Sequence, residues 1–195
     1  MILAKYLLLL SGAAHAFVVP ADQPNGLYAV VTQADGQDVH IPIDGLSNQE
    51  VVEVIAAHNI TIPTTKPNLP ARARSSSSFV PKKERRDVTD TVSCANYRLN
   101  EGDCDAAVNG LDNNCGDSKF LPPGTKFYYV AGSVVAYMCD FGRDGSTCSR
   151  GLIDDSNRRI TSSCGLYVAG WRTQQGPTWW YSNGYENRGD GGFCG

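Results

Sequence analysis

The chain has 195 residues and a formal net charge of −3 at pH 7, so it has room for one domain with processing segments or for two small domains. From Asp87 onward it carries 13 acidic and nine basic side chains, a net of −4. Binding to nucleic acid or to an anionic membrane relies on basic surface, so this balance argues against both kinds of partner. All seven cysteines lie at position 94 or beyond, whereas the three histidines lie at positions 15, 40 and 58.

Residues 1–16 have the pattern of a secretory signal peptide. Lys5 provides the positive charge, residues 6–10 the apolar run, and Ala14-His15-Ala16 the small-x-small motif that precedes cleavage after Ala16. The apolar run is too short to cross a bilayer, and no later segment has the roughly 20 apolar residues of a spanning helix. We therefore expect a secreted, extracellular protein with no membrane span, a destination that suits its cysteines.

Residues 17–86 are predicted to be a pro-segment that begins with some regular structure. Residues 27–43 alternate loosely between apolar and polar positions around a turn at 34–36, which indicates a hairpin. Ser47 can cap a short helix over residues 48–57. The pattern is compatible with a folding aid and with a temporary inhibitor, and both roles stay open.

Residues 61–86 are rich in proline, serine and basic residues, a composition typical of a disordered linker. The linker ends in a dibasic pair, Arg85 and Arg86, which suits a processing protease of the secretory pathway. We expect cleavage after Arg86, which would release residues 87–195 as the mature cysteine-rich domain. An uncleaved basic linker is the alternative.

Two helices are predicted within this domain. The first covers residues 101–115, and Gly110 in its middle lowers its intrinsic stability by about 1 kcal/mol relative to alanine. Its inward face is formed by Cys104, Val108, Leu111 and Cys115. The second helix begins after Ser149, a favourable N-cap, and ends before Gly165, which can adopt a left-handed conformation.

Four strands are predicted around these helices. Residues 126–131 and 134–141 form a hairpin, in which Asp140 is expected to face water, and residues 166–172 and 179–186 form two further strands. The simplest packing is a four-stranded antiparallel sheet with both helices on one face. The predicted fold class is therefore α+β, a small disulfide-rich two-layer sandwich.

Seven cysteines in an oxidising compartment predict three disulfides and one unpaired thiol, although spacing does not decide the connectivity. Cys104 is predicted to be the unpaired one, because Cys115 shares its helix face and lies nearer the helix end. Its thiol could join two chains into a disulfide-linked dimer or stay buried and inert. The six remaining cysteines are Cys94, Cys115, Cys139, Cys148, Cys164 and Cys194.

The absence of histidine from residue 87 onward excludes Ser-His and Cys-His nucleophile pairs within the mature domain. We therefore expect no enzyme, no catalytic residue, no metal and no cofactor. Asp154 and Asp155 are better explained by the helix dipole and by pairs with Arg158 and Arg159 than by catalysis. Asp140 and Asp144 flank a loop but lack the dense oxygen spacing of a calcium loop.

An aromatic cluster near the C-terminus is the predicted binding surface. It contains Trp179, Trp180, Tyr181 and Tyr185. Since neighbouring side chains of a strand point to opposite faces, Trp179 and Trp180 cannot both lie in the core, and one should be exposed. The tripeptide Arg188-Gly189-Asp190 could engage an integrin-like receptor, but three-residue matches often arise by chance.

Three short stretches are similar to small secreted cysteine-rich proteins of filamentous fungi. They are residues 132–139 (GSVVAYMC), 163–171 (SCGLYVAGW) and 192–194 (GFC). More remotely, the succession of strand, cysteine, helix and Cys-Gly resembles the killer-toxin-like proteins of fungi. This resemblance implies an α/β sandwich that acts on competing cells or on a host, and it implies no catalytic residue.

From these features we expect a secreted, non-catalytic effector or toxin-like protein that binds an extracellular protein or glycan after removal of the pro-segment. One alternative is a carbohydrate-binding module centred on Trp179, Trp180 and Tyr181. The other is a small carboxylate-dependent hydrolase. Two carboxylates facing each other across a pocket would favour the hydrolase, and an exposed aromatic patch without such a pocket would favour binding.

Overall fold

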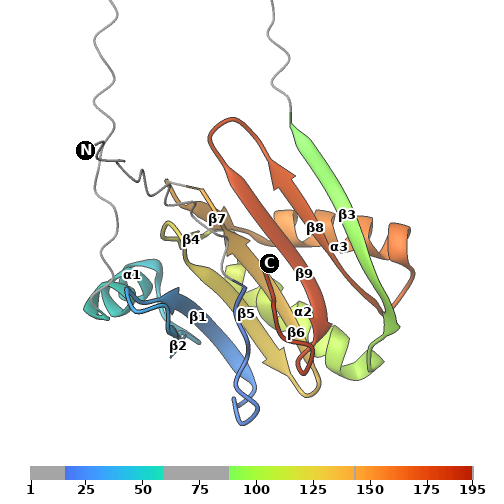
Figure 1. Cartoon of the computed structure of the whole chain (residues 1–195), viewed down its shortest axis with the longest axis horizontal. Coiled ribbons are helices and arrows are strands. Elements are labelled where there is room, and N and C mark those ends of the chain that lie inside the picture. The colour runs from blue at the N-terminus through green and yellow to red at the C-terminus, as the bar shows by residue number, and fades with distance from the viewer. Residues whose placement is uncertain (1–15, 59–87, 143, 195) are drawn as a thin grey trace, which may run out of the picture.

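The structure is a computed structural model and describes residues 16–58, 88–142 and 144–194 (Figure 1). The predicted signal peptide, apart from Ala16, lies outside the described residues. So do the predicted linker and the processing site at Arg85 and Arg86.

Within the described residues, seven strands form one antiparallel sheet in the order β2-β1-β5-β6-β9-β8-β3, and β4 pairs with β7 in a second, two-stranded sheet. The helices are α1 (Asn48–Ala57), α2 (Glu101–Cys115) and α3 (Arg150–Cys164). The strands are β1 (Gly26–Thr32), β2 (Asp38–Pro42), β3 (Thr89–Arg98), β4 (Lys119–Leu121), β5 (Lys126–Ala131), β6 (Val134–Asp140), β7 (Ser146–Cys148), β8 (Val168–Gln175) and β9 (Trp180–Asn187).

The α+β class is as predicted, but the main sheet has seven strands and not four. The four predicted strands, β5, β6, β9 and β8, lie at its centre. β3 extends the sheet on one side, where it pairs with β8. On the other side β1 pairs with β5 and β2 pairs with β1. Residues expected to form a separate pro-segment therefore belong to the same sheet as the cysteine-rich part.

Both long helices lie on one face of the sheet, behind it in Figure 1. Asn100 caps α2 by accepting a hydrogen bond from the amide of Asp103, and Ser149 caps α3 in the same way from Leu152. Apolar side chains of both helices join one core cluster with the sheet, to which α1 also contributes. Five of these helical residues are Val51, Ile55, Leu111, Ile153 and Ile160.

The prediction that Asp140 faces water is wrong, since its relative exposure is only 2%. Every residue of β6 is buried, because the helices cover one face of this central strand and a second apolar cluster covers the other. An alternating pattern predicts an exposed face only for a sheet that is solvated on one side. β6 lies in a part of the sheet that is covered on both.

The six cysteines predicted to pair do form disulfides, and Cys104 is left with a free, buried thiol. Cys94–Cys164 joins the edge strand β3 to the end of α3. Cys115–Cys148 joins the end of α2 to β7, and Cys139–Cys194 fixes the C-terminal tail to β6. Each native disulfide of a small domain typically stabilises it by about 2–4 kcal/mol.

Candidate functional site

The face of the main sheet that points away from α2 and α3, here called the outer face, is covered over only part of its width. Residues 17–19 and the C-terminal tail lie over β1, β5 and β6 and form an apolar cluster with them. Phe17 is fully buried there and pairs with Phe193 through backbone hydrogen bonds of 3.0 and 3.1 Å. The strands themselves are therefore not accessible to a partner on this part of the face.

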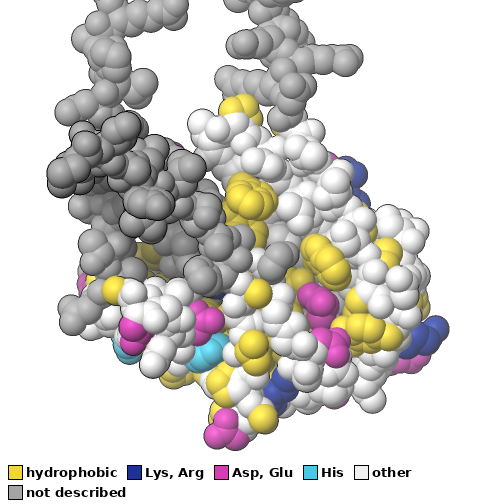
Figure 2. Space-filling model, in the orientation of Figure 1, with side chains coloured by type: hydrophobic (Ala, Val, Ile, Leu, Met, Phe, Trp, Pro, Cys, Tyr) yellow, Lys and Arg dark blue, Asp and Glu magenta, His cyan; other side chains and the backbone are white. Residues whose placement is uncertain are grey.

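The part of the outer face formed by β9, β8 and β3 is open. Trp171 and Thr173 of β8 are partly exposed, Thr91 of β3 is exposed, and Trp180 of β9 is 36% exposed. Figure 2 shows hydrophobic and acidic side chains gathered over this part of the molecule. We call it the outer-face patch, and its outward side chains are Thr91, Ser93, Phe141, Trp171, Thr173, Trp180 and Glu186.

The structure separates the four aromatic residues of the predicted binding surface. Trp180 packs on Phe141 with 4.6 Å between the centroids of the two tilted rings and belongs to the patch. Trp179 and Tyr181 stack on each other at 5.3 Å, and Tyr181 packs against the helix-side core cluster, on the other face of the sheet. Tyr185 is only 3% exposed, because its position in β9 points to the helices, where its hydroxyl contacts that of Thr161. Tyr185 therefore does not belong to any exposed surface.

Trp171 is a member of the patch that the sequence analysis did not identify. It lies opposite Gly184 in the pairing of β8 with β9, and a Cβ at position 184 would come within 2.6 Å of the Cβ of Trp171. The glycine thus allows the backbone of β8 at Gly170 and Trp171 to approach β9 closely. A glycine within a strand often marks such a close approach, which is the signal that could have drawn attention to this pair.

Two acidic side chains lie at the end of the patch, each paired with a tyrosine. The hydroxyl of Tyr137 donates to Glu186 and that of Tyr97 donates to Asp190, both through short hydrogen bonds. Burial raises the pKa of the Glu186 carboxyl, and the nearby Asp190 carboxylate adds to this shift. Among the described residues neither acid has an ion pair, so this end of the patch holds two acidic side chains without a cationic partner.

A small pocket opens between Trp171 and Glu186, with Tyr137, Ser182, Gly192 and Cys194 as its other walls. Its volume is about 50 Å³. Sites for small-molecule substrates usually enclose about 300–1,000 Å³, so this one has room for one small polar group but not for a sugar ring. Only Glu186 of the two acids lines it. The geometry is therefore not that of two carboxylates facing each other across a substrate cleft.

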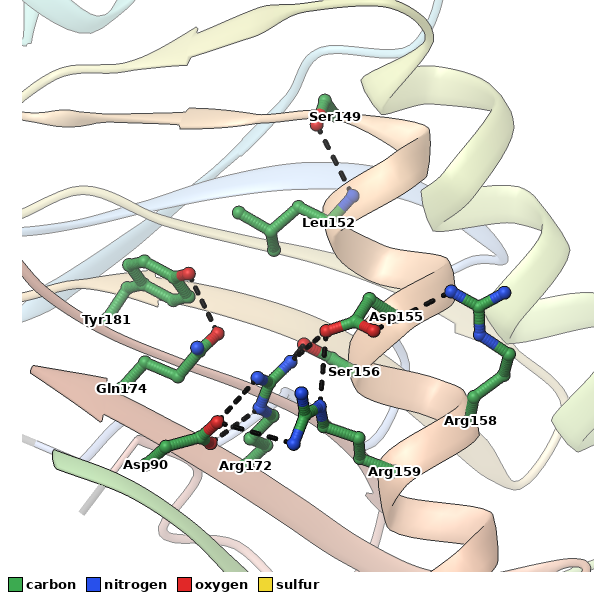
Figure 3. Close-up of polar contacts among 10 residues, drawn as sticks. All are labelled: Asp90, Ser149, Leu152, Asp155, Ser156, Arg158, Arg159, Arg172, Gln174 and Tyr181. Carbon is green, nitrogen blue, oxygen red and sulfur yellow. Dashed lines mark hydrogen bonds and ion pairs between the residues drawn. The ribbon is translucent and has the colours of Figure 1, made fainter. Parts of the chain in front are cut away.

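An ion-pair cluster on the helix side holds the edge of the patch in place (Figure 3). The guanidinium of Arg172, which is 3% exposed, donates to both carboxylate oxygens of Asp90 at 2.7 Å and to Asp155 at 2.7 Å. β8, β3 and α3 are thereby joined from behind. Arg159 and Arg158 of α3 also pair with Asp155, at 3.3 and 3.6 Å.

These contacts explain Asp155 of α3 without catalysis, whereas Asp154 has no ion pair among the described residues, because its expected partner Arg158 pairs with Asp155. Hydrogen bonds from Arg172 hold the pKa values of Asp90 and Asp155 below their usual range. Both groups are therefore ionised and paired at neutral pH, unlike a general acid. A broader concavity of about 360 Å³ beside them is lined by Asp90, Val92, Arg158, Arg159, Ser162 and Ser163. Ion pairs with Asp90 and Asp155 offset the positive charge of Arg159 in the wall of this concavity.

The Arg188-Gly189-Asp190 tripeptide is engaged within the protein. Arg188 donates to the carbonyl groups of Pro20 and Ala21 at 2.6 and 2.7 Å. Asp190 accepts the hydrogen bond from Tyr97. Both charged groups that a receptor would need already have partners, so the motif is best explained by these internal contacts.

One histidine of the N-terminal part lies in the main sheet. Nδ1 of His40, on β2, is 2.8 Å from the hydroxyl of Tyr128, and the ring also packs near Phe17. Burial lowers the pKa of this imidazole. Residues 87–195 lack histidine, but the folded protein as a whole does not. His40 lies on the covered part of the outer face and not at the patch.

The described residues contain no group of three or more His, Cys, Asp or Glu side chains arranged to hold a metal ion. None of the described helices is both long and apolar enough to cross a bilayer.

The fold and the patch together define a class: a disulfide-linked α+β protein with helices on one face of an antiparallel sheet and a partly open opposite face. Comparison with protein-family models, with curated proteins and with solved structures found no match.

Proposed function

We propose that the protein is a secreted, non-catalytic effector or toxin-like protein that recognises an extracellular protein through its outer-face patch. The observation that carries this proposal is the open half of a sheet face on which Trp180 is exposed and Trp171 is partly exposed, beside the acidic side chains of Glu186 and Asp190. Exposed tryptophans are the residues most enriched at the energetic centres of protein interfaces.

The rigidity of the support favours recognition of a macromolecule. Cys94–Cys164 fixes β3, and the cluster around Arg172 fixes β8 against α3, so the patch lies on elements that are held from behind. A preformed surface loses little conformational entropy on binding. The small pocket beside Glu186 suits a basic group on the rim of such an interface better than a substrate.

Binding of the labelled protein to intact and protease-treated cells tests this proposal. The variants are Trp180→Ala and Trp171→Ala, and the matched control is Phe120→Ala, which removes a side chain of β4 with 38% exposure, similar to that of Trp180. We expect each tryptophan variant to bind at least about tenfold more weakly while remaining folded, and the control to bind normally. Protease treatment of the cells should abolish binding.

Two results would overturn the proposal. Equal binding by all variants would mean that the patch is not used. Undiminished binding to protease-treated cells, together with retention on chitin or β-glucan, would transfer the function to the second candidate, a carbohydrate-binding module. That candidate is favoured by the two separate indole rings of Trp171 and Trp180, since aromatic faces stack on sugars.

The hydrolase alternative has a separate test. It depends on Glu186, the partly buried acid of the patch whose pKa is raised. Turnover of a polysaccharide or peptide substrate that is lost in Glu186→Gln would establish an enzyme. We expect neither the wild-type protein nor the variant to release product.

A further inference from the structure

We propose that residues 17–57 are a permanent subunit of the protein and stay bound, without a covalent link, after the chain is cut behind them. The mature protein would then consist of two polypeptides that share one sheet. This goes beyond the proposed function, since it concerns the composition of the active protein and not its target.

The first observation is the place of β1 in the main sheet. It pairs with β5 over five residue pairs, from Gly26 with Val130 to Val30 with Lys126. Its side chains are buried on both faces of the sheet, with Leu27 and Ala29 toward the helices and Tyr28 and Val30 toward the outer face. Without β1, the central part of the sheet would end in an unpaired edge at β5. Such an edge is a template for aggregation.

The second observation is the core that this segment completes on the helix side. Val51 and Ile55 of α1 and Ile41 of β2 are almost fully buried in the same cluster as Phe127 of β5 and Leu121 of β4. A helix that covers the core in this way is part of the folded unit. Loss of residues 17–57 would remove these apolar side chains from the shared core cluster, which opposes dissociation.

The third observation is the seat of the segment on the outer face. Phe17 packs on Tyr128 at 5.2 Å and on Phe193 at 5.3 Å, and Tyr28 stacks on Tyr128 at 5.2 Å. The guanidinium of Arg188 holds Pro20 and Ala21 by their carbonyl groups. Residues 17–57 therefore contact the rest of the protein before and after β1 and on both faces of the main sheet.

No disulfide can link the two polypeptides, because every cysteine lies at position 94 or beyond. A cut after Arg86 leaves the contacts just described untouched, since all of them join described residues outside 59–87. Retention therefore depends on burial and hydrogen bonding alone, and it can be measured as a dissociation constant.

The test uses the full chain with a specific protease site in place of residues 75–78, so that cutting is complete. After cutting, denaturing mass spectrometry should give two polypeptides, while native mass spectrometry and size exclusion should give one species containing one copy of each. Arg188→Ala should raise the dissociation constant at least about tenfold, since it removes two charge-assisted hydrogen bonds. Arg158→Ala, which removes a largely exposed side chain on α3, should not change it.

Separate elution of the two polypeptides in native buffer, in the protein without further substitutions, would overturn the proposal. That result would return residues 17–57 to the role of a discarded pro-segment. It would leave the proposed function standing, because the outer-face patch lies entirely within residues 91–186. Conversely, loss of binding function with retained pairing would affect only the proposed function.

Discussion

Gly110 of α2 lies directly against the ring of Tyr129 on β5. A Cβ at position 110 would lie 2.5 Å from Cδ1 of that ring, closer than carbon atoms can approach. The glycine that weakens the helix in isolation is therefore what allows the helix to lie close to the sheet. Local propensity and tertiary packing have opposite preferences at this position.

Gly110→Ala should consequently destabilise the protein, by about 1–2 kcal/mol, because overpacking against Tyr129 outweighs the gain in helix propensity. The matched control is Gly151→Ala in the first turn of α3, where nothing lies within 4 Å of the added Cβ. That variant should be unchanged or more stable by up to about 1 kcal/mol. Urea unfolding measures both, and a stabilised Gly110→Ala protein would contradict the packing.

Arg172→Met should destabilise the protein by about 2–3 kcal/mol. The substitution leaves only the more distant guanidinium of Arg159 to join Asp90 and Asp155, and both acids are partly exposed, so the loss should be smaller than the roughly 3–5 kcal/mol of a fully buried pair. Arg158→Met, on the exposed side of α3, should cost less than about 1 kcal/mol. Equal unfolding free energies for the two variants would show that the buried cluster has no special role.

Asp140 should make the protein less stable as the pH rises from about 4 to about 6. Burial raises the pKa of its carboxyl to about 6, above the value of about 3.9 in an unfolded chain. The folded state therefore binds this proton more tightly, so ionisation lowers the free energy of unfolding across this window and keeps it lowered above it. Neither of its carboxylate oxygens has a hydrogen bond of good geometry among the described residues, and the weaker contacts with Ser146, Gly142 and Gly124 offset only part of the effect of burial.

Asp140→Asn should flatten the pH dependence between about 4 and 6 and should stabilise the protein at pH 7 by up to about 2 kcal/mol. Thermal unfolding from pH 3.5 to 7.5 measures this. Asp117→Asn is the charge-matched control on an exposed turn. Below about pH 4 the wild-type protein and Asp140→Asn should both lose stability, because Asp90, whose pKa is lowered by Arg172, then becomes protonated. If Asp140→Asn showed the same pH dependence of stability as the wild-type protein, Asp140 would not cause that dependence.

Cys104 should remain a single unreacted thiol in the folded protein. Burial raises its pKa to about 11, and the thiolate, which is the reactive form, is therefore rare at neutral pH. Alkylation in native buffer should be slow and should become fast in denaturant. Intact mass without reduction should be that of one chain, and a disulfide-linked dimer would show that the thiol is reachable.

Local signals in the sequence were sufficient for most helices and hairpins. The predicted bounds of the helix over 101–115 agree with α2, and the turn at Gly132-Ser133 joins β5 to β6 as expected. These elements depend on caps, glycines and alternation within a few residues. β3 was missed because its sequence, TDTVSCANYR, is polar and half-exposed, and its strand state depends on pairing with β8.

The candidate site was predictable only in part. The run Trp179-Trp180-Tyr181 predicted an exposed aromatic side chain, and Trp180 is exposed. The sequence did not indicate Trp171, Phe141 or Glu186 as neighbours of Trp180. They come from β8, from the end of β6 and from the far end of β9, and only strand pairing brings them to one face.

The sequence by itself determined the helices and the hairpins, because these follow from contacts between residues close in the chain. That Cys104 is the unpaired cysteine was predicted correctly, but it depends on disulfides between residues 33 to 70 positions apart. The tertiary structure decided that residues 17–57 complete the sheet, that Asp140 is buried and that half of the outer face stays open. These properties depend on which strands become neighbours. That choice arises from the burial of apolar faces contributed by segments more than 90 residues apart, such as β1 and β5, which no local pattern records.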